Sequence, residues 1–266
     1  MIKIFLYAVM TFGLFSCEKD TQPQNDETMT EMTIEFDNIM GGQNLFLNAV
    51  TYTNAAGEPF TVSMAQYYIS NIKLRKADGS EYVVTQDSSY FLIKESDPLT
   101  RFARFKVPVG NYHQVSFVVG VDSLRSTMDI TQRTGVLDPA GGMDDGMYWG
   151  WNSGYIFLRL EGTSPLAPVD PSGQRKYRYH IGGFGGYSAP TINNIKTITT
   201  DLTASGIVQA RAGRTANIHY LVDLMKVFNG TTNVSIAANP SIMFSNYSVN
   251  VANNYAAMFY HDHTEN

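Results

Sequence analysis

Histidine is the residue type through which this chain could hold a metal ion. The sequence contains five histidines, and His261 and His263 are separated by a single residue near the end of the chain. On an extended segment, residues two apart point the same way, so one ion could take both imidazoles while Asp262 would point away. The alternative is a pair of solvated histidines on a fraying end, and the spacing alone favours that alternative.

Two further histidines are candidates as single residues. His180 lies between aromatic residues and glycines, where a hydrogen-bonded structural histidine is the commoner case. His219 belongs to a segment, residues 217–224, in which apolar and polar residues alternate. That alternation predicts a strand with His219 and Asp223 on the face opposite the apolar side chains.

Both tryptophans fall in one glycine-rich segment, residues 135–162. On a strand, Trp149 and Trp151 would share a face with Tyr155 and Phe157. A stacked aromatic layer in the core is the favoured interpretation, because such a layer buries a large area. The alternative is an indole beside a metal or redox site.

Motifs and composition argue against two large classes of function. The sequence lacks a G-x-S-x-G nucleophile turn, an H-E-x-x-H zinc motif and a P-loop, and no Lys-Ser/Thr pair follows the glycine-rich run from Gly182 to Gly186. The net charge of −5 disfavours nucleic-acid binding, which needs a basic surface. We therefore predict a protein that is not an enzyme and that binds no nucleic acid.

The start of the chain resembles a bacterial lipoprotein signal. Lys3 precedes an apolar run from Ile4 to Phe15, which is shorter than the roughly 20 residues that a membrane-spanning helix needs and suits a signal peptide. An aliphatic residue, Leu14, stands three positions before Cys17, as in the lipobox. The resemblance implies cleavage before Cys17 and lipidation of Cys17, which is the only cysteine of the chain.

This start divides the chain into three parts. Residues 1–16 are the expected signal peptide, residues 17–30 the acylated cysteine and a polar, flexible tether, and residues 31–266 a single domain. The charged residues directly after Cys17 resemble the surface-export signal of lipoproteins in Bacteroidota-type bacteria. We therefore predict an outer-membrane lipoprotein of the cell envelope, periplasmic or surface-exposed, with a membrane as its first partner.

The domain that must position the histidines is predicted to be all-β. An Asp78-Gly79 turn predicts a hairpin, and only residues 123–130 and the last twenty residues could form short helices. We expect a β-sandwich or barrel-like single domain with a few short helical turns. Aromatic and β-branched segments predict its strands at residues 33–36, 65–74, 82–84, 112–121, 154–160 and 217–224.

Several of these segments together resemble the MbnP family, which is named for its association with methanobactin, a copper-binding peptide. The likeness covers about residues 32–266, and its most specific element is MYWGWNSGY at residues 147–155. The other matching segments are YISNIKL at 68–74, FVVGVD at 117–122, LDP at 137–139, YHIGG at 179–183 and NNYAAMFYHDH at 253–263.

The resemblance implies an extracytoplasmic, β-rich protein with copper as its cofactor. In some relatives, histidines hold the copper together with kynurenine, an oxidised tryptophan made by a partner diheme enzyme of the peroxidase type. This chain has no Trp-x-His pair and no cysteine in its domain, which departs from those relatives. By motif position, the implied ligands are His180 and His263, with His261 or His219 as a third. Trp149 and Trp151 would line the site or be oxidised.

Two functions remain open at this point. The first is a lipid-anchored copper-binding protein that captures or delivers the metal. The second is a cell-envelope interaction lipoprotein that binds a protein or glycan through exposed aromatic residues. Convergent imidazoles would favour the first function, and an exposed aromatic patch would favour the second. The aromatic candidates are Tyr177, Tyr179, Phe184 and Tyr187.

Overall fold

Strands are the predominant secondary structure in the computed structural model, which describes residues 28–151 and 154–266. Cys17 and the predicted signal peptide lie outside the described residues, so their predicted roles stay predictions. Strand β1 (Met29–Met40) begins inside the segment predicted as a tether. Within the described part of the chain, no helix has the length and apolar character needed to cross a membrane.

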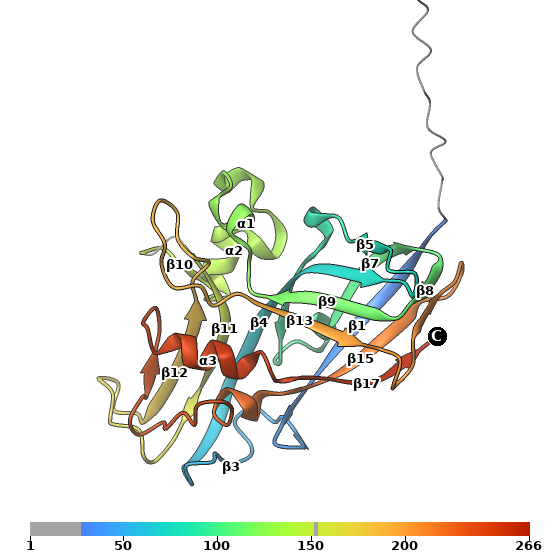
Figure 1. Ribbon diagram of the computed structural model, residues 1–266. Helices are drawn as coiled ribbons and strands as arrows, with labels where there is room; N and C mark the ends of the chain where they lie inside the picture. Colours follow the sequence, from blue (N-terminus) through green and yellow to red (C-terminus); the bar gives the residue numbers. More distant parts are fainter. Residues whose placement is uncertain (1–27, 152–153) are drawn as a thin grey trace, which may run out of the picture.

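The first of two large sheets has five strands and carries the C-terminus at one edge (Figure 1). Strand β1 lies inside it, parallel to β15 and antiparallel to β2 and β7. The other members are β2 (Gln43–Asn44), β7 (Phe102–Pro108), β15 (Ala216–Asp223) and β17 (Phe259–Glu265).

The second sheet has ten strands and is built around the long strand β4 (Pro59–Arg75). Its central path runs in the order β13-β9-β4-β11-β12-β16. These strands are β9 (Gln114–Val119), β11 (Gly154–Thr163), β12 (Lys176–Gly182), β13 (Lys196–Asp201) and β16 (Ser241–Ile242). Shorter members pair with β4 or β11, namely β3 (Tyr52–Thr53), β5 (Glu81–Val83), β6 (Tyr90–Lys94) and β10 (Tyr148–Trp149). Strands β8 (Gly110–Tyr112) and β14 (Val208–Ala210) form a separate pair.

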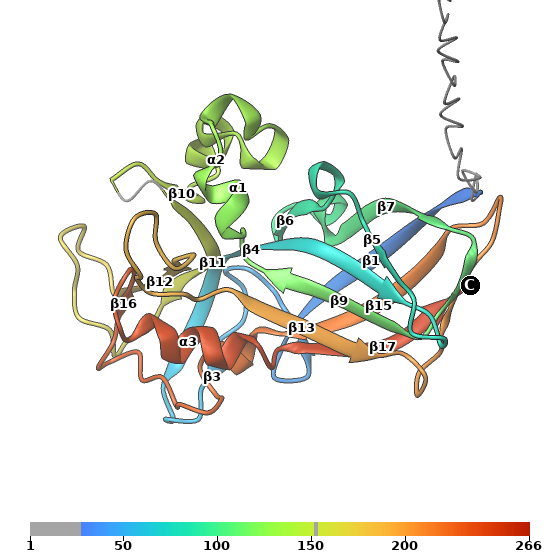
Figure 2. The same cartoon turned by 45° about the horizontal axis from the view of Figure 1, so that its top comes forward.

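Helices are short and lie away from the end of the molecule where β17 finishes at the C-terminus (Figure 2). The α-helices are α1 (Ser123–Thr127), α2 (Pro139–Asp144) and α3 (Ser248–Tyr255). Five 3₁₀ turns complete the described elements: η1 (Gln86–Ser88), η2 (Pro98–Arg101), η3 (Ile130–Gln132), η4 (Gly135–Leu137) and η5 (Leu224–Val227).

The core forms where the inner faces of the two large sheets meet. Phe36 and Tyr220 come from the five-stranded sheet and Phe117 from the ten-stranded sheet, and all three are at most 1% exposed. The ring centroids of Phe36 and Phe117 are 5.6 Å apart in an edge-to-face arrangement, a favourable geometry for aromatic pairs. The predicted all-β fold is confirmed.

Alternating side chains give the five-stranded sheet one apolar face and one polar face. Ile34 and Phe36 of β1 and Ile218 of β15 are fully buried, because every second residue of a strand points to the same side. Glu35, between Ile34 and Phe36, and His219, next to Ile218, point to the opposite side and lie side by side in the parallel register. The prediction that His219 lies opposite the apolar face of its strand is therefore confirmed.

Most predicted elements are present, with three differences. The hairpin is confirmed, because β4 pairs with β5 around Gly79, whose φ is 88°. The strand predicted at residues 112–121 is instead divided at His113 into β8 and β9. Helix α2 was missed because its glycines disfavour helix, yet Pro139 suits a first helical position. The last twenty residues contain both the expected helix, α3, and an edge strand, β17.

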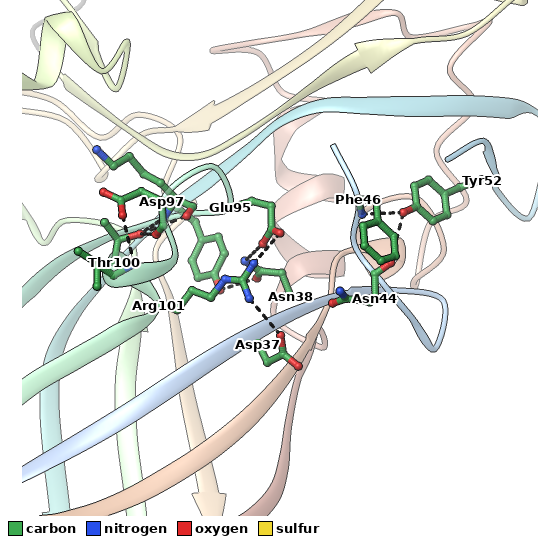
Figure 3. Close-up of polar contacts among 12 residues, drawn as sticks. Asp37, Asn38, Asn44, Phe46, Tyr52, Glu95, Asp97, Thr100 and Arg101 are labelled. Atoms are coloured by element: carbon green, nitrogen blue, oxygen red, sulfur yellow. Dashed lines mark hydrogen bonds and ion pairs between the residues drawn. The ribbon is translucent and has the colours of Figure 1, made fainter. Parts of the chain in front are cut away.

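A polar cluster ties β1 to the neighbouring strands inside the fold (Figure 3). The Glu95 carboxylate accepts hydrogen bonds from Asn38 Nδ2 at 3.0 Å and from Arg101 Nη2 at 2.8 Å. The Tyr67 hydroxyl donates to Asn38 Oδ1 at 2.8 Å, and Arg101 also lies 3.7 Å from Asp37 Oδ1. Burial raises the pKa of Glu95. These bonds link β1, β4 and the β6–η2 segment, so we assign the cluster a structural role.

Candidate metal centre

Three side chains on the polar face of the five-stranded sheet are close enough to hold one metal ion. They are His219 of β15 and Asp262 and His263 of β17, and their potential ligand atoms all lie within 4.8 Å of one another. The side chains of Asp262 and His263 are 42% and 47% exposed, whereas that of His219 is 15% exposed. The cluster is thus open to solvent on one side and backed by the sheet on the other.

The pairing of β15 with β17 places the two imidazoles opposite each other. His219 is the direct partner of His263 in this antiparallel pair, and their ring centroids are 4.8 Å apart. Cross-strand neighbours of this kind have Cβ atoms about 4.5–5.5 Å apart. The separation therefore follows from backbone register, and no rearrangement is needed to bring the rings together.

A β-bulge adds the carboxylate to the two imidazoles. The register shifts between His219 and Tyr220, because Tyr220 pairs with His261 and leaves Asp262 as an extra residue in β17. The Asp262 Oδ2 atom lies 2.8 Å from His263 Nδ1 and 3.3 Å from His219 Nδ1. The expectation that Asp262 points away from the metal site is therefore wrong, since the bulge interrupts the alternation on which it rested.

The contact between Asp262 and the two imidazoles favours the charged forms of Asp262 and His263. The hydrogen bond with His263 lowers the pKa of Asp262, and the contact with His219 acts in the same direction. The same bond to Asp262 raises the pKa of His263. Asp262 is therefore a carboxylate at neutral pH. A metal ion must compete with protons for the imidazole nitrogens, so metal affinity should fall as acidification protonates His263.

Two further carboxylates, held by Asn217, lie beside the cluster. Asn217 is 8% exposed, and its Nδ2 atom donates to Glu35 Oε2 and to Glu265 Oε2, each at 3.2 Å. Thr33 Oγ1 in turn donates to Asn217 Oδ1 at 2.8 Å. Glu265 Oε1 also lies 3.5 Å from His263 Nε2. Asn217 thus holds two carboxylates at the rim of the cluster.

Replacing Asn217 by alanine is expected to weaken copper binding by up to about tenfold, because it frees Glu265, which contacts the candidate ligand His263. The substitution releases Glu35 and Glu265 from their shared donor while leaving the three candidate ligands in place. Copper titration of the variant measures the change. Asn246→Ala, at an exposed position outside the cluster, is the matched control. Equal affinities for both variants would contradict the positioning role of Asn217.

His261 does not join the centre. It is 7% exposed, its ring lies 5.9 Å from that of Tyr220, and its Nε2 atom is 3.0 Å from Thr264 Oγ1. Burial lowers the pKa of His261. Because the bulge lies between them, His261 and His263 point to different faces of the sheet, which the H-x-H spacing did not reveal.

His180 lies on the other large sheet, in β12, and is not brought near His263. Its Nε2 atom is 2.7 Å from Glu161 Oε1, and Arg159 Nε donates to the same oxygen at 2.6 Å. Burial works to raise the pKa of Glu161, but the bonds from His180 and Arg159 outweigh it and lower this pKa to about 2. The geometry agrees with the alternative of a hydrogen-bonded structural histidine.

Replacing Glu161 by glutamine is expected to lower the free energy of unfolding by about 1–3 kcal/mol at neutral pH, and by less in acid. The folded-state pKa of about 2 lies below the ordinary glutamate pKa of 4.5. The carboxylate therefore stabilises the fold above pH 4.5, and this stabilisation is lost as pH falls through 2. Denaturant unfolding across this range tests the prediction. Glu81→Gln, at an exposed position on β5, is the control. A loss of unfolding free energy in Glu161→Gln that is the same at every pH would contradict the prediction.

The tryptophans and the aromatic candidates lie away from the metal cluster. Trp149 of β10 is 5% exposed and packs in a second core cluster with Tyr155 and Phe157. Trp151 is 68% exposed, so the two indoles do not share one buried face, although their centroids are 5.4 Å apart. Figure 1 shows β10 at the opposite side of the molecule from β15 and β17.

The four aromatic candidates do not form an exposed patch. Tyr177 and Tyr179 are fully buried, Phe184 is 8% exposed, and Tyr187 is 53% exposed. Phe184 and Tyr187 line a small pocket of about 120 Å³ together with Phe244. By the burial criterion stated above, convergent imidazoles and buried aromatic residues favour the metal-binding function over the interaction function.

Sequence reasoning missed four polar residues of this centre. Asp262 was assigned to the wrong face, and Glu35, Asn217 and Glu265 were not considered. The alternation of β1 could have placed Glu35 on a polar face, since Ile34 and Phe36 flank it. Its closeness to His219 depends on the parallel pairing of β1 with β15, which joins segments far apart in the chain.

Comparisons with known proteins agree on one family. The family model described as MbnP matches residues 29–244, a range that ends before β17. The solved structure of "MbnP from Methylosinus trichosporium" is similar with a TM-score of 0.53 and 16% identity, covering 77% of this chain and 80% of that chain. At that identity the likeness is one of fold. No curated protein matches the chain significantly in sequence.

Proposed function

The chain belongs to the MbnP family, and from this premise we propose that it is a copper-binding protein of the cell envelope that captures or delivers the metal without catalysis. The observation that carries the proposal is the convergence of His219, Asp262 and His263 on one open sheet face. Family membership supports the choice of copper, because methanobactin, for which the family is named, is a copper-binding peptide.

The donor set fits copper on chemical grounds. Imidazole nitrogen binds copper well, and among divalent first-row metals copper forms the strongest complexes with nitrogen and oxygen ligands. His219 and His263 would supply the nitrogens and Asp262 an oxygen. Three protein ligands leave coordination positions for water or for an exchanging ligand. The exposure of Asp262 and His263, at 42% and 47%, suits an ion that must enter and leave.

Native mass spectrometry of the mature protein after copper loading tests this function. We expect one copper ion per chain, bound with 1:1 stoichiometry. Retention of the metal after desalting, together with loss of binding in variants of the cluster, would support the proposal. A protein that takes up no copper in either oxidation state would reject it.

The envelope location rests on the start of the chain. We expect Cys17→Ala to abolish acyl labelling and to leave the precursor uncleaved, because the lipobox cysteine is both the lipid attachment site and the first residue of the mature protein. Metabolic labelling with a fatty acid and the mobility of the protein on gels measure the two effects. A Ser16→Ala variant, which keeps a small residue before the cysteine, is the control. Unchanged processing of Cys17→Ala would contradict the anchor.

We also propose that a partner enzyme oxidises a tryptophan of this chain. The family resemblance implies a diheme enzyme of the peroxidase type that oxidises tryptophan. If such a partner acts on this chain, Trp151 is the accessible target, because it is 68% exposed whereas Trp149 is 5% exposed. Mass analysis of the protein purified from its own cells would detect kynurenine, in which the tryptophan side chain has gained one oxygen atom and lost one carbon atom.

A further inference from the structure

A small pocket lies against the second core cluster, at the end of the molecule that carries β10 (Figure 1). Its volume is about 120 Å³. An engineered cavity of about 150 Å³ binds benzene, so this pocket suits a single six-membered ring. Phe184, Tyr187 and Phe244 supply its aromatic walls, and its lining residues differ from those of the metal cluster. The pocket is therefore a candidate site separate from the metal centre.

The hairpin that forms one wall of the pocket is held by backbone hydrogen bonds. The Gly185 N–H donates to Ile192 O at 3.1 Å, and the Thr191 N–H donates to Gly185 O at 2.9 Å. Gly183 and Gly186 have φ values of 109° and 96°, which residues other than glycine rarely adopt. The wall is thus preformed, so little conformational entropy is lost when a ligand binds.

The aromatic rings are fixed in place although they are open to solvent. Tyr187 is 53% exposed, yet its hydroxyl donates to Ser126 O at 2.7 Å. Its ring also packs edge-to-face on Phe184 at a centroid distance of 5.0 Å. Phe244 is half-buried and its ring centroid lies 6.1 Å from that of Trp149. Rings held in one orientation offer apolar contact area to a ligand at a low cost in side-chain entropy.

The rest of the lining is polar but uncharged. Thr191 contributes a hydroxyl group, and the glycines contribute peptide groups. None of the lining residues in the described part of the chain is acidic or basic. A purely apolar ligand would bury these polar groups without partners, which costs free energy, and a charged ligand would find no counter-ion.

A neutral sugar ring matches both parts of this lining. It presents an apolar face of C–H bonds to the aromatic rings and hydroxyl groups to the polar atoms. We propose that the pocket of Phe184, Tyr187 and Phe244 binds one pyranose ring of a neutral glycan. This binding site goes beyond the copper-binding function and does not depend on it.

Trp151 extends the aromatic surface beyond the pocket. Its indole is 68% exposed and lies 5.4 Å from that of Trp149, whose ring in turn meets Phe244. The next ring of a glycan can therefore stack on this exposed indole. The pocket would hold the first ring, and Trp151 would add affinity for a longer chain.

Titration of the full mature protein with neutral sugars tests the proposal. The probes are glucose, galactose and N-acetylglucosamine, each beside a disaccharide that contains it, namely cellobiose, lactose and diacetylchitobiose. Saturation-transfer NMR detects contact with the sugar, and fluorescence of the two tryptophans reports binding beside them. We expect at least one monosaccharide to bind with a dissociation constant of about 1–10 mM, as suits a ligand of this size. Its disaccharide should bind at least about threefold more tightly, because it gains an aromatic contact.

Three substitutions divide the site into its parts. Thr191→Val removes the hydroxyl while keeping the size of the side chain, and we expect it to weaken monosaccharide binding by about three- to tenfold. Phe244→Ala removes one wall and should weaken binding by at least about tenfold. Trp151→Ala should reduce the affinity for the disaccharide to that for the monosaccharide. Thr197→Val and Phe46→Ala, at exposed positions outside the pocket, are the matched controls, and a thermal melt shows that each variant keeps its fold.

Each result decides the proposal. Sugar binding that is weakened by Thr191→Val and by Phe244→Ala, and kept by both controls, supports it. Sugar binding that ignores the two pocket variants would overturn the assignment to this pocket. Absence of binding by every sugar would overturn the proposal, as would tighter binding of benzyl alcohol, a probe for an apolar side chain of a protein partner. A His219→Ala/His263→Ala double variant should bind sugar normally, so this proposal and the copper-binding function can fail separately.

Discussion

Replacing either His219 or His263 by alanine is expected to lower the affinity for copper by at least about 100-fold. Each substitution removes one of two imidazole ligands, and its effect should exceed the 10- to 100-fold loss typical of an outer-shell change. The free energy of unfolding should change by no more than about 0.5 kcal/mol for His263, because it lies on a solvent-exposed face. Copper titration by competition, beside a denaturant unfolding curve for each variant, measures both quantities.

His113→Ala and His180→Ala provide the controls for these histidine variants. His113 lies between β8 and β9, and His180 is bonded to Glu161 on the other sheet, so neither contributes a ligand to the cluster. Both controls should keep the copper affinity of the unmodified protein. If His180→Ala lost copper while His219→Ala kept it, the ligand set implied by the family resemblance would be right, and the centre described on β15 and β17 would be wrong.

Replacing Trp149 by alanine is expected to cost about 3–5 kcal/mol of unfolding free energy, as large-to-small changes of buried tryptophan do. The indole is 5% exposed and packs on Gly182, where an added Cβ would lie 2.7 Å from Trp149 Cζ3. Its ring also meets Phe244 at a centroid distance of 6.1 Å. Removing it leaves a cavity in the second core cluster that the surrounding strands cannot fill.

Trp151→Ala is the matched control for this substitution. It removes the same side chain from a position that is 68% exposed, and we expect a change within about 0.5 kcal/mol. Copper affinity should be unaltered in Trp151→Ala, since β10 lies on the opposite side of the molecule from β15 and β17, the strands that carry the metal cluster (Figure 1). Loss of copper binding in the folded Trp151→Ala variant would show that an indole lines the metal site after all.

Local patterns in the sequence were sufficient for several of the strands, β15 among them, and for the chemistry of the faces of β15. The alternation of residues 217–224 predicts both the strand and the polar side on which His219 lies, because burial of one face demands a period of two. The Asp78-Gly79 turn likewise predicts the hairpin of β4 and β5, since Gly79 takes the positive φ that such a turn requires. Helix α2 was not predicted, because it contains two adjacent glycines, which have a low helix propensity.

The composition of the metal centre was decided by strand pairing. The H-x-H spacing offers His261 together with His263 as candidate ligands, and the family resemblance implies His180 and His263. The structure instead pairs His263 with His219 and turns Asp262 toward both through a bulge. It also buries His261 on the apolar side and places His180 on the second sheet. A bulge of one residue changes which side chains share a face, and its position depends on the partner strand.

The sequence by itself thus determined an all-β domain with His219 on the polar side of its strand, because alternation and turn chemistry act over a few neighbouring residues. Only the tertiary structure decided which histidines meet. His219 and His263 come from strands whose register is set by the packing of an aromatic layer, Phe36, Tyr220 and Phe259, against Phe117 of the other sheet. Register between distant strands follows from the burial of whole faces, and no short motif encodes it.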